Sequence, residues 1–347
     1  MTDLQSMIKF LKEYDGESVR IMEVCGTHTA AISENGIHQI VSPKIKLISG
    51  PGCPVCVTVA SYIDRLIELS MKPDTCVVTF GDMIRVCGNE KSLSEAKADG
   101  ANVKMVYSPF DIIEMAKENE GTLFVFAAVG FETTTPIYAM LVKQIIEQNI
   151  KNIKLLTALK TMPTVIDTLC SQGIEVDGFI APGHVSVITG SELFKPLAEK
   201  YNLPFVVSGF EGKDLVEAIY AILKLKNNGK VRNLYIEAVS AEGNEKAKGL
   251  VNKYFMPYSA AWRGLGVIEN SGMVLRDEYK FLDAGSYDLI NDNAKVTGCR
   301  CTDVVCGRIA PTQCGLFGKK CTPSTPQGAC MVSTEGSCFN YFVNKRV

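Results

Sequence analysis

Short apolar and β-branched runs alternate with amphipathic helical patterns from residue 19 to residue 239. The runs that predict strands are residues 19–24, 44–49, 76–80, 103–107, 122–129, 153–159, 178–182, 204–209 and 233–239. Helical patterns lie between most of them, for example at residues 57–70, 136–149 and 163–173. This alternation is typical of parallel sheets, and the nearly continuous apolar strands are expected where helices cover both faces. The pattern predicts an α/β fold.

The same pattern suggests four parts along the chain. Residues 1–17 form an amphipathic helix with Leu4, Met7, Ile8 and Leu11 on one face. Nine strands are many for one open sheet, so we expect two α/β domains, at residues 18–145 and 146–240. The alternation stops near residue 241, and residues 241–347 are predicted to form a Cys-rich C-terminal domain organised by metal.

Composition and charge narrow the class of protein. The 347 residues are 46% hydrophobic and 21% charged, which is ordinary for a globular chain, and the net charge of −2 argues against a nucleic-acid partner. The N-terminal helix lacks the features of a signal peptide, and Glu132 and Pro136 interrupt the most apolar stretch, residues 123–142. We therefore expect a cytoplasmic protein without a membrane span.

The 13 cysteines are unevenly distributed, with six in the first 298 residues and seven in the last 49. In a reducing cytosol an odd number favours metal or redox chemistry over structural disulfides. Residues 297–340 combine the seven cysteines with six glycines and three prolines, a composition of turns around a centre. Four thiolates can bind zinc or a [4Fe-4S] cluster, and the absence of paired CxxC knuckles here disfavours a zinc ribbon.

The motif EVCGTHT, residues 23–29, places Cys25 at the end of a predicted strand and His28 three residues later. Both side chains are expected at the carboxyl edge of a sheet, where open α/β folds bind ligands. One thiolate and one imidazole would leave coordination positions open on a metal. The alternative is a buried cysteine and a hydrogen-bonded histidine without chemistry.

The motif SGPGCPVCVT, residues 49–58, places Cys53 and Cys56 between a predicted strand and a predicted helix. A CxxC pair in this context predicts a reversible disulfide, because a helix N-terminus stabilises a thiolate. A zinc half-site and an inert structural pair are the alternatives. The zinc reading lacks a second CxxC anywhere in the chain.

Two further loops follow predicted strands. GFETTTP, residues 130–136, contains Glu132 and Thr133 and offers hydroxyl and N–H groups to an anion or polar ligand. APGHVS, residues 181–186, brings His184 toward the space between the two predicted domains. Helix capping is an equally good explanation of either loop taken alone. The Walker A and dinucleotide-binding glycine patterns are absent from the sequence.

Taken together, the motifs resemble the HypD family of [NiFe]-hydrogenase maturation proteins. The resemblance rests on EVCGTHT, GPGCPVCV, TFGDMIRV, GFETTTP, APGHVS, WRGLG and the tail CGLFGKKCTPSTPQGACMVSTEGSC, and extends from about residue 19 to residue 341. It implies two Rossmann-like α/β domains and a C-terminal domain with a [4Fe-4S] cluster. It also implies a chain that is monomeric until it joins a small HypC-like chaperone, on which an Fe(CN)2CO unit is built with cyanide from a HypE-like donor.

The resemblance also implies roles for individual residues. Cys25 would be the iron ligand with a cysteine of the partner, His28 would lie close by, and Cys53 and Cys56 would be a redox pair. Glu132, Thr133 and His184 complete the candidate catalytic set. The implied cluster ligands are Cys299, Cys314, Cys321 and Cys338, while Cys301 and Cys330 fall in matching segments. One departure is Cys87, which stands where the family usually has proline.

The sequence therefore predicts a cytoplasmic scaffold that assembles Fe(CN)2CO, with a dithiol and a [4Fe-4S] cluster supplying electrons and without a simple turnover reaction. The rival enzyme is a free-standing iron-sulfur thiol-disulfide oxidoreductase. The rival binding module has a structural zinc in the Cys-rich tail.

Overall fold

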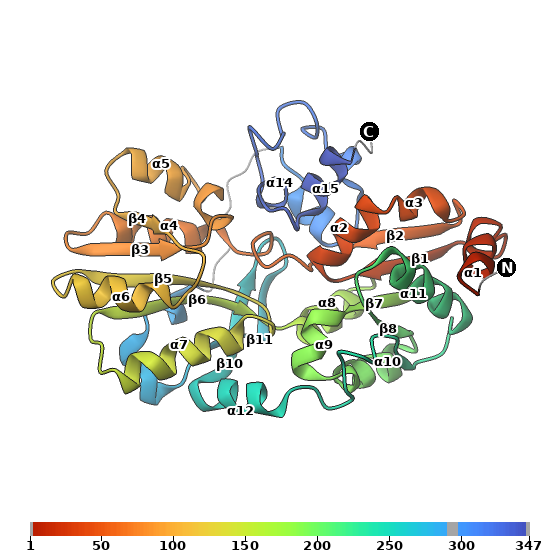
Figure 1. The fold of residues 1–347 in the computed structure, drawn as a ribbon. Helices are drawn as coiled ribbons and strands as arrows, with labels where there is room; N and C mark the ends of the chain where they lie inside the picture. Colours follow the sequence, from red (N-terminus) through yellow and green to blue (C-terminus); the bar gives the residue numbers. More distant parts are fainter. Residues whose placement is uncertain (1–2, 290–297, 345–347) are drawn as a thin grey trace.

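The computed structural model describes residues 3–289 and 298–344, which form two β-sheets, surrounding helices and a Cys-rich C-terminal segment (Figure 1). The α-helices are α1 (Asp3–Lys12), α2 (Gly26–Glu34), α3 (Ile37–Ile40), α4 (Ala60–Ser70), α5 (Leu93–Ala98), α6 (Asp111–Glu118), α7 (Thr135–Glu147), α8 (Met162–Ser171), α9 (Gly183–Thr189), α10 (Lys195–Tyr201), α11 (Gly212–Lys224), α12 (Glu245–Tyr254), α13 (Cys301–Val305), α14 (Ala329–Val332) and α15 (Ser337–Val343). Short 3-10 helices are η1 (Met83–Arg85), η2 (Ser191–Phe194), η3 (Asp277–Leu282), η4 (Ser286–Asp288) and η5 (Pro311–Gln313).

The first sheet has five parallel strands in the order β2 (Ile45–Ser49), β1 (Val19–Glu23), β7 (Gly178–Pro182), β8 (Phe205–Ser208) and β9 (Val231–Asn233). The chain leaves β1 toward β2 on one side, and β7 pairs with β1 on the other side. The direction of winding thus reverses between β1 and β7, and such a reversal opens a crevice at the carboxyl ends of the strands. We name this place the first switch point.

The second sheet has six strands in the order β10 (Phe255–Trp262), β11 (Gly266–Leu275), β6 (Ile153–Lys160), β5 (Leu123–Gly130), β3 (Thr75–Thr79) and β4 (Val103–Met105). Strands β4, β3, β5 and β6 are parallel, whereas β11 and β10 are antiparallel to their neighbours. Winding reverses here between β3 and β5. We name this place the second switch point.

The predicted α/β class is confirmed, and eight of the nine predicted strands coincide with observed ones. The strand predicted at residues 233–239 is wrong, because β9 ends at Asn233. The Asn233 side chain accepts a hydrogen bond from the Tyr235 N–H and donates one to the Val239 carbonyl oxygen, which turns the chain. The hairpin β10–β11 was not predicted, because half-exposed residues and Pro257 interrupt its apolar pattern.

The sheets interleave along the sequence. Strands β1 and β2 of the first sheet lie in the predicted segment 18–145, and β7, β8 and β9 lie in 146–240. The second sheet likewise takes β6 from 146–240 and β10 and β11 from 241–347. A boundary near residue 145 therefore does not separate the sheets, because periodicity reveals a strand but not its partner.

Successive side chains along a strand point to opposite faces of the sheet, so each strand contributes to two apolar clusters. On β3, Cys76 and Val78 face the helices outside the second sheet, whereas Val77 belongs to the largest apolar cluster. That largest cluster also contains Met22 of β1 and Cys330 of the Cys-rich segment. One continuous core thus joins both sheets and the tail. Across residues 3–289 and 298–344, no helix has the length and apolarity needed to cross a membrane.

Candidate functional site at the first switch point

Cys25 lies where β1 ends and α2 begins. It is the N-cap residue of α2, with extended backbone, and its side chain is half-buried. The backbone N–H groups of Thr27 and His28 favour the thiolate, but burial has the larger effect and raises the pKa of Cys25 to about 12. Cys25 is therefore a neutral thiol unless a cation stabilises its anion.

Glu23, at the end of β1, holds this turn from beneath. Its carboxylate is buried and accepts hydrogen bonds from the Cys25 N–H at 3.0 Å and from the Thr29 hydroxyl. Burial raises the pKa of Glu23 from 4.5 to about 7, although these hydrogen bonds act in the opposite direction. A buried acid thus fixes the backbone that presents the Cys25 thiol.

Two histidines from the two sides of the switch point meet at one phenylalanine. The His28 Nε2–H donates to the Gly209 carbonyl oxygen at 3.0 Å, and burial lowers the pKa of His28 to about 4. The Phe210 ring lies 4.7 Å from the His28 ring and 4.0 Å from that of His184, between centroids. The His28 ring is therefore enclosed, whereas His184 is exposed and stacks one face on Phe210; partial burial also lowers the pKa of His184.

The CxxC motif forms a disulfide between Cys53 and Cys56, with a Cα–Cα distance of 5.3 Å. Both residues are buried, and the Cys56 N–H donates to the Cys53 sulfur at 3.1 Å. The predicted helix N-terminus is not at this motif, because α4 begins only at Ala60. A turn, and not a helix end, carries the pair.

The Cys25 turn and the disulfide loop touch through their backbones. The Gly26 N–H donates to the Gly52 carbonyl oxygen at 3.0 Å. A Cβ atom on Gly52 would lie 2.2 Å from the Cys25 nitrogen, so this approach requires glycine. The structure thus brings together two motifs that the sequence separates by about 25 residues.

The Cys-rich segment encloses a small cavity. The cysteines that line it are Cys299, Cys301, Cys314, Cys321, Cys330 and Cys338, whereas Cys306 is buried outside it. Apolar side chains complete the wall, and burial raises the pKa of the Cys299 thiol to about 12. The Cys301 and Cys330 side chains share a hydrogen bond, and the Cys338 N–H donates to the Cys330 sulfur at 3.2 Å.

These six thiols surround a space and do not converge on one point. Within residues 3–289 and 298–344, no group of three or more His, Cys, Asp or Glu side chains is arranged around a single metal ion. A multi-iron cluster differs from a single ion, because each thiolate binds a different iron and the sulfurs stand farther apart. Thiols of this kind can bind zinc or an iron-sulfur cluster.

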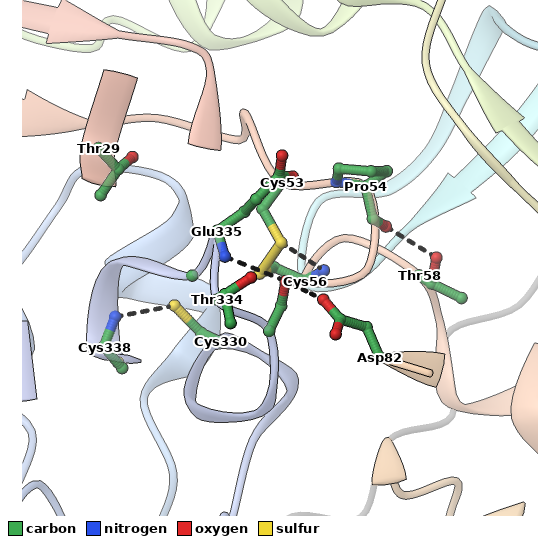
Figure 2. The surroundings of a disulfide bond; sticks show 12 residues. Thr29, Cys53, Pro54, Cys56, Thr58, Asp82, Cys330, Thr334, Glu335 and Cys338 are labelled. Atoms are coloured by element: carbon green, nitrogen blue, oxygen red, sulfur yellow. Dashed lines mark hydrogen bonds between the residues drawn. A yellow bond between two sulfur atoms is a disulfide. The ribbon is translucent and has the colours of Figure 1, made fainter. Parts of the chain in front are cut away.

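Residues 333–335 connect this cavity to both switch points. The Ser333 hydroxyl donates to Asp82, which follows β3, at 3.1 Å. Glu335 bonds with the Thr27 side chain, and a Cβ atom on Gly26 would lie 2.4 Å from the Glu335 Cβ. Figure 2 shows the disulfide beside Thr334 and Glu335, with Cys330 and Cys338 in the same segment.

A buried arginine provides a second connection. Arg263, in the turn between β10 and β11, donates from Nε to the Thr58 carbonyl oxygen at 2.7 Å and from its backbone N–H to the Val57 carbonyl oxygen at 2.9 Å. A hydrogen bond with Cys330 and burial together raise the pKa of Cys301, and the positive charge of Arg263 acts in the opposite direction. Arg263 thus places a cation between the disulfide loop and the cavity.

Glu132 and Thr133 belong to a different environment. The Glu132 carboxylate accepts the Met162 N–H at 2.7 Å, and burial raises its pKa to about 7. Glu132 lines a cavity of about 190 Å³ with Thr161 and Lys248, and Cys25 is not part of that cavity. The Thr133 hydroxyl lies 3.4 Å from that of Thr134.

Sequence reasoning missed several residues that build the site. Glu23, Asp82 and Glu335 lie within the motifs, but their residue types alone did not predict a role. Phe210 lies outside the motifs, although it comes two residues after the end of β8 and would be expected near the same sheet edge. The usable signal was position, since each of Glu23, Asp82 and Phe210 lies at or just beyond the carboxyl end of a strand.

Comparison with known proteins gives a consistent result. Residues 2–345 match the model of the HypD family, described as the hydrogenase formation hypA family. The chain is 40% identical over 335 residues to a putative hydrogenase expression/formation protein of Methanocaldococcus jannaschii, covering 95% of this chain and 93% of the relative. It is 40% identical over 334 residues to the hydrogenase maturation factor HypD of Rhodobacter capsulatus, covering 93% and 89%. It is 38% identical over 333 residues to HypD of Escherichia coli K12, covering 93% and 88%.

Proposed function

Because the chain belongs to the HypD family of hydrogenase maturation factors, we propose that it is the scaffold on which a HypC-like partner and this protein assemble Fe(CN)2CO. A HypE-like protein would donate the cyanide. The observation that carries this proposal is the contact of the Cys25 turn with both the disulfide loop and residues 333–335. A thiol, a dithiol pair and a Cys-lined cavity are thereby adjacent.

The iron atom is the substrate, and Cys25 is its proposed ligand on this chain. A half-buried thiol can be reached by a partner, and its pKa near 12 means that a cation must be present for the thiolate to form. One protein thiolate leaves positions for cyanide, carbon monoxide and a thiolate of the partner. His28 and His184 would shape the apolar side of this place through Phe210, since both are held as neutral rings.

Four of the six cavity cysteines would hold a [4Fe-4S] cluster. We assign Cys299, Cys314, Cys321 and Cys338, because their spacing resembles the ligand set of the family. Side-chain hydrogen bonds link Cys330 to both Cys301 and Cys338, so these bonds do not select among the six cysteines. The buried, otherwise apolar wall makes four uncompensated thiolates costly, and an iron cluster would remove that cost. A bound cluster would supply single electrons at low potential. Arg263 would offset the negative charge nearby.

The Cys53–Cys56 disulfide is the proposed partner in electron transfer. Its reduction takes two electrons and two protons, breaks the S–S bond and yields two thiols. Both sulfurs are shielded from solvent, so electrons from within the protein are favoured over a bulky thiol reagent.

The formed disulfide also bears on the rival function, a free-standing thiol-disulfide oxidoreductase. Attack by a protein thiolate requires access to a sulfur, yet Cys53 is 6% and Cys56 2% exposed. We therefore prefer the scaffold. Rapid turnover of a generic protein disulfide without any partner would reverse this preference.

Infrared spectroscopy of the complex with a HypC-like partner, purified without oxygen, tests the iron assignment. Bands of iron-bound cyanide and carbon monoxide are expected in the parent complex and absent with Cys25→Ala. Cys170→Ala is the matched control, because Cys170 is also half-buried but lies on α8. Bands that persist in the Cys25→Ala complex would eliminate Cys25 as the ligand.

Iron and sulfide analysis tests the cluster. About four iron and four sulfide per chain are expected, falling to near zero in Cys321→Ala. Cys306→Ala removes a buried cysteine from the same segment without touching the cavity wall, and should retain both. Zinc without sulfide would instead favour the structural-zinc alternative.

A further inference from the structure

A groove of about 510 Å³ lies between the edge of the first sheet and the Cys-rich segment. One wall is β2 with its neighbour Arg20 of β1 and His38 of α3. The other is formed by Val304, residues 307–311, Gln313, Ser337 and Tyr341. The groove is separate from the first switch point, since neither Cys25 nor the disulfide lines it. We name it the β2 groove.

The β2 groove is lined by cations. Arg20, Lys46 and Arg308 contribute to its wall, and no Asp or Glu does. Arg20 and Lys46 are register partners on neighbouring strands, so their side chains project from the same face of the sheet. The side chain of Ile48 shares this face with the two cations of the strands, whereas Ile45 and Leu47 are buried in the apolar cluster on the other face of the sheet.

These charges are only partly compensated by the protein. Lys46 is exposed, and no ion pair or hydrogen bond of its ammonium group occurs within the described part of the chain. Arg308 approaches Asp303 at 3.6 Å, but Asp303 is also bound by Arg300 at 2.9 Å, so two arginines share one carboxylate. The Arg20 Nε donates to a backbone carbonyl, which carries no net charge.

The backbone of the same wall is available for pairing. β2 is the outermost strand of its sheet and pairs only with β1 in the described structure. An outermost strand presents N–H and C=O groups to which an extended peptide can add. The side chains of such a peptide would alternate between the cationic face and the opposite side.

We propose that the β2 groove binds an acidic, extended segment of a partner protein. Charge complementarity favours carboxylates against Arg20, Lys46 and Arg308, and the free edge of β2 favours an extended backbone. The proposal goes beyond the proposed function, which needs partners but does not say where they bind. Val304 lines both the β2 groove and the Cys-lined cavity, so a segment bound here lies one side chain away from that cavity.

Binding of a fluorescein-labelled peptide that alternates Glu with Val, measured by anisotropy with the full chain, tests the proposal. Saturable binding is expected, weakening with salt, and Lys46→Glu and Arg308→Glu should each raise Kd by about tenfold or more. The same peptide with Lys in place of Glu should not bind. Methylation of alternate backbone nitrogens should also weaken binding if the peptide pairs with β2.

Lys104→Glu provides the matched control. Lys104 is an exposed lysine on β4, the edge strand of the second sheet, and it does not line the β2 groove. Short edge strands often carry lysine only to prevent unwanted pairing. If Lys46→Glu and Arg308→Glu change Kd no more than Lys104→Glu, or if no saturable binding occurs, the groove is only a protected edge and the proposal is wrong.

These results are independent of the iron chemistry. The Lys46→Glu and Arg308→Glu chains should retain the circular dichroism, iron and sulfide of the parent, which separates lost docking from lost folding. Infrared bands that vanish with Cys25→Ala while no acidic peptide binds would leave the scaffold function intact and overturn the β2 groove alone.

Discussion

The two switch points have the same topology, but in the described structure only the first carries a cysteine and histidines at its strand ends. Each lies where winding reverses, between β1 and β7 in the first sheet and between β3 and β5 in the second. The first carries a thiol and two packed histidines, and its backbone touches the disulfide loop. The second carries Asp82, which bonds Ser333, and Glu132, which bonds the start of α8.

This difference shows that a reversal of winding opens a crevice at the strand ends, whereas the side chains that line the crevice determine its chemistry. At the first switch point, glycines allow three chain segments to approach within contact distance, and soft ligands occupy the space. At the second, carboxylates and hydroxyls bond to neighbouring segments and hold them in position. We interpret the first as the reactive centre and the second as its mechanical support.

The largest expected effect concerns glycine. Gly52→Ala should lower the free energy of unfolding by about 3 kcal/mol or more, because its Cβ would lie 2.2 Å from the Cys25 nitrogen, a backbone atom that cannot move alone. Gly81→Ala, in the loop after β3, meets only the flexible Met105 sulfur at 3.2 Å and should remain within about 1 kcal/mol of the parent. Urea unfolding measures both.

Equal losses in the two glycine variants would contradict this contrast. A Gly52→Ala chain that is fully stable would mean that the Cys25 turn and the disulfide loop do not need their close contact.

The next effect concerns Glu23 and Glu132, the two glutamates whose pKa is raised to about 7. Glu23→Gln should lower the free energy of unfolding by about 2 kcal/mol. The Thr29 hydroxyl and the Cys25 N–H both donate to the carboxylate, and the glutamine NH2 group would face one of these two donors. Glu132→Gln keeps an oxygen for the Met162 N–H and turns its NH2 toward the cavity. It should be as stable as the parent at pH about 8, or more stable.

The pH dependence sharpens this prediction. The folded protein holds the Glu132 proton up to about pH 7, whereas the unfolded chain releases it near 4.5. The stabilisation is therefore complete below pH 4.5 and is lost as pH rises through 7, by up to about 3 kcal/mol. Glu132→Gln should make this decline shallower when thermal unfolding is followed against pH, while the part due to Glu23, whose pKa is also about 7, remains. An unchanged decline would show that Glu132 ionises normally.

The smallest effect concerns His28. Burial lowers the pKa of His28 from 6.5 to about 4. Between about pH 4 and pH 6.5 the imidazole is therefore protonated in the unfolded chain and neutral in the folded protein. Stability is therefore lost as pH falls from 6.5 toward 4. His28→Gln should cost only about 1 kcal/mol at neutral pH, since an amide can still donate to Gly209, and should make the acid decline shallower by up to about 1.4 kcal/mol per pH unit.

His184→Gln is the comparison for His28, because its pKa is also lowered by burial but its ring is more exposed. It should change the acid decline less. The reverse order would mean that His184, and not His28, is the less solvated of the two rings.

Sequence reasoning succeeded where the signal is local. Strand β5 is one apolar run and α7 follows it with a proline in its first turn, so both were predictable from their own residues. The position of Cys25 at the end of a strand and the pairing of Cys53 with Cys56 were predictable in the same way, whereas their chemistry stays a prediction. Strand β10 was missed because half of its residues are only partly buried, which removes the periodic signal.

The sequence did not predict contacts between segments that are far apart along the chain. The residues of β1 do not predict that β7 is its neighbour, because main-chain hydrogen bonds form between strands whatever their side chains are. The contact of Glu335 with Thr27 and the bond of Ser333 to Asp82 have the same character. These contacts bring the Cys25 turn, the disulfide loop and the Cys-rich segment together. A motif search finds each of these segments but does not show that they are neighbours.

The insertion of four strands between β2 and β7 has a consequence for biosynthesis. β1 ends at Glu23 and its neighbour β7 begins at Gly178, so 154 residues must be translated in between. At about 5–20 residues per second, the ribosome needs roughly 8 to 30 seconds for this stretch. During that time the nascent first sheet holds only two strands, and the second sheet, which emerges later, gains its first four parallel strands sooner.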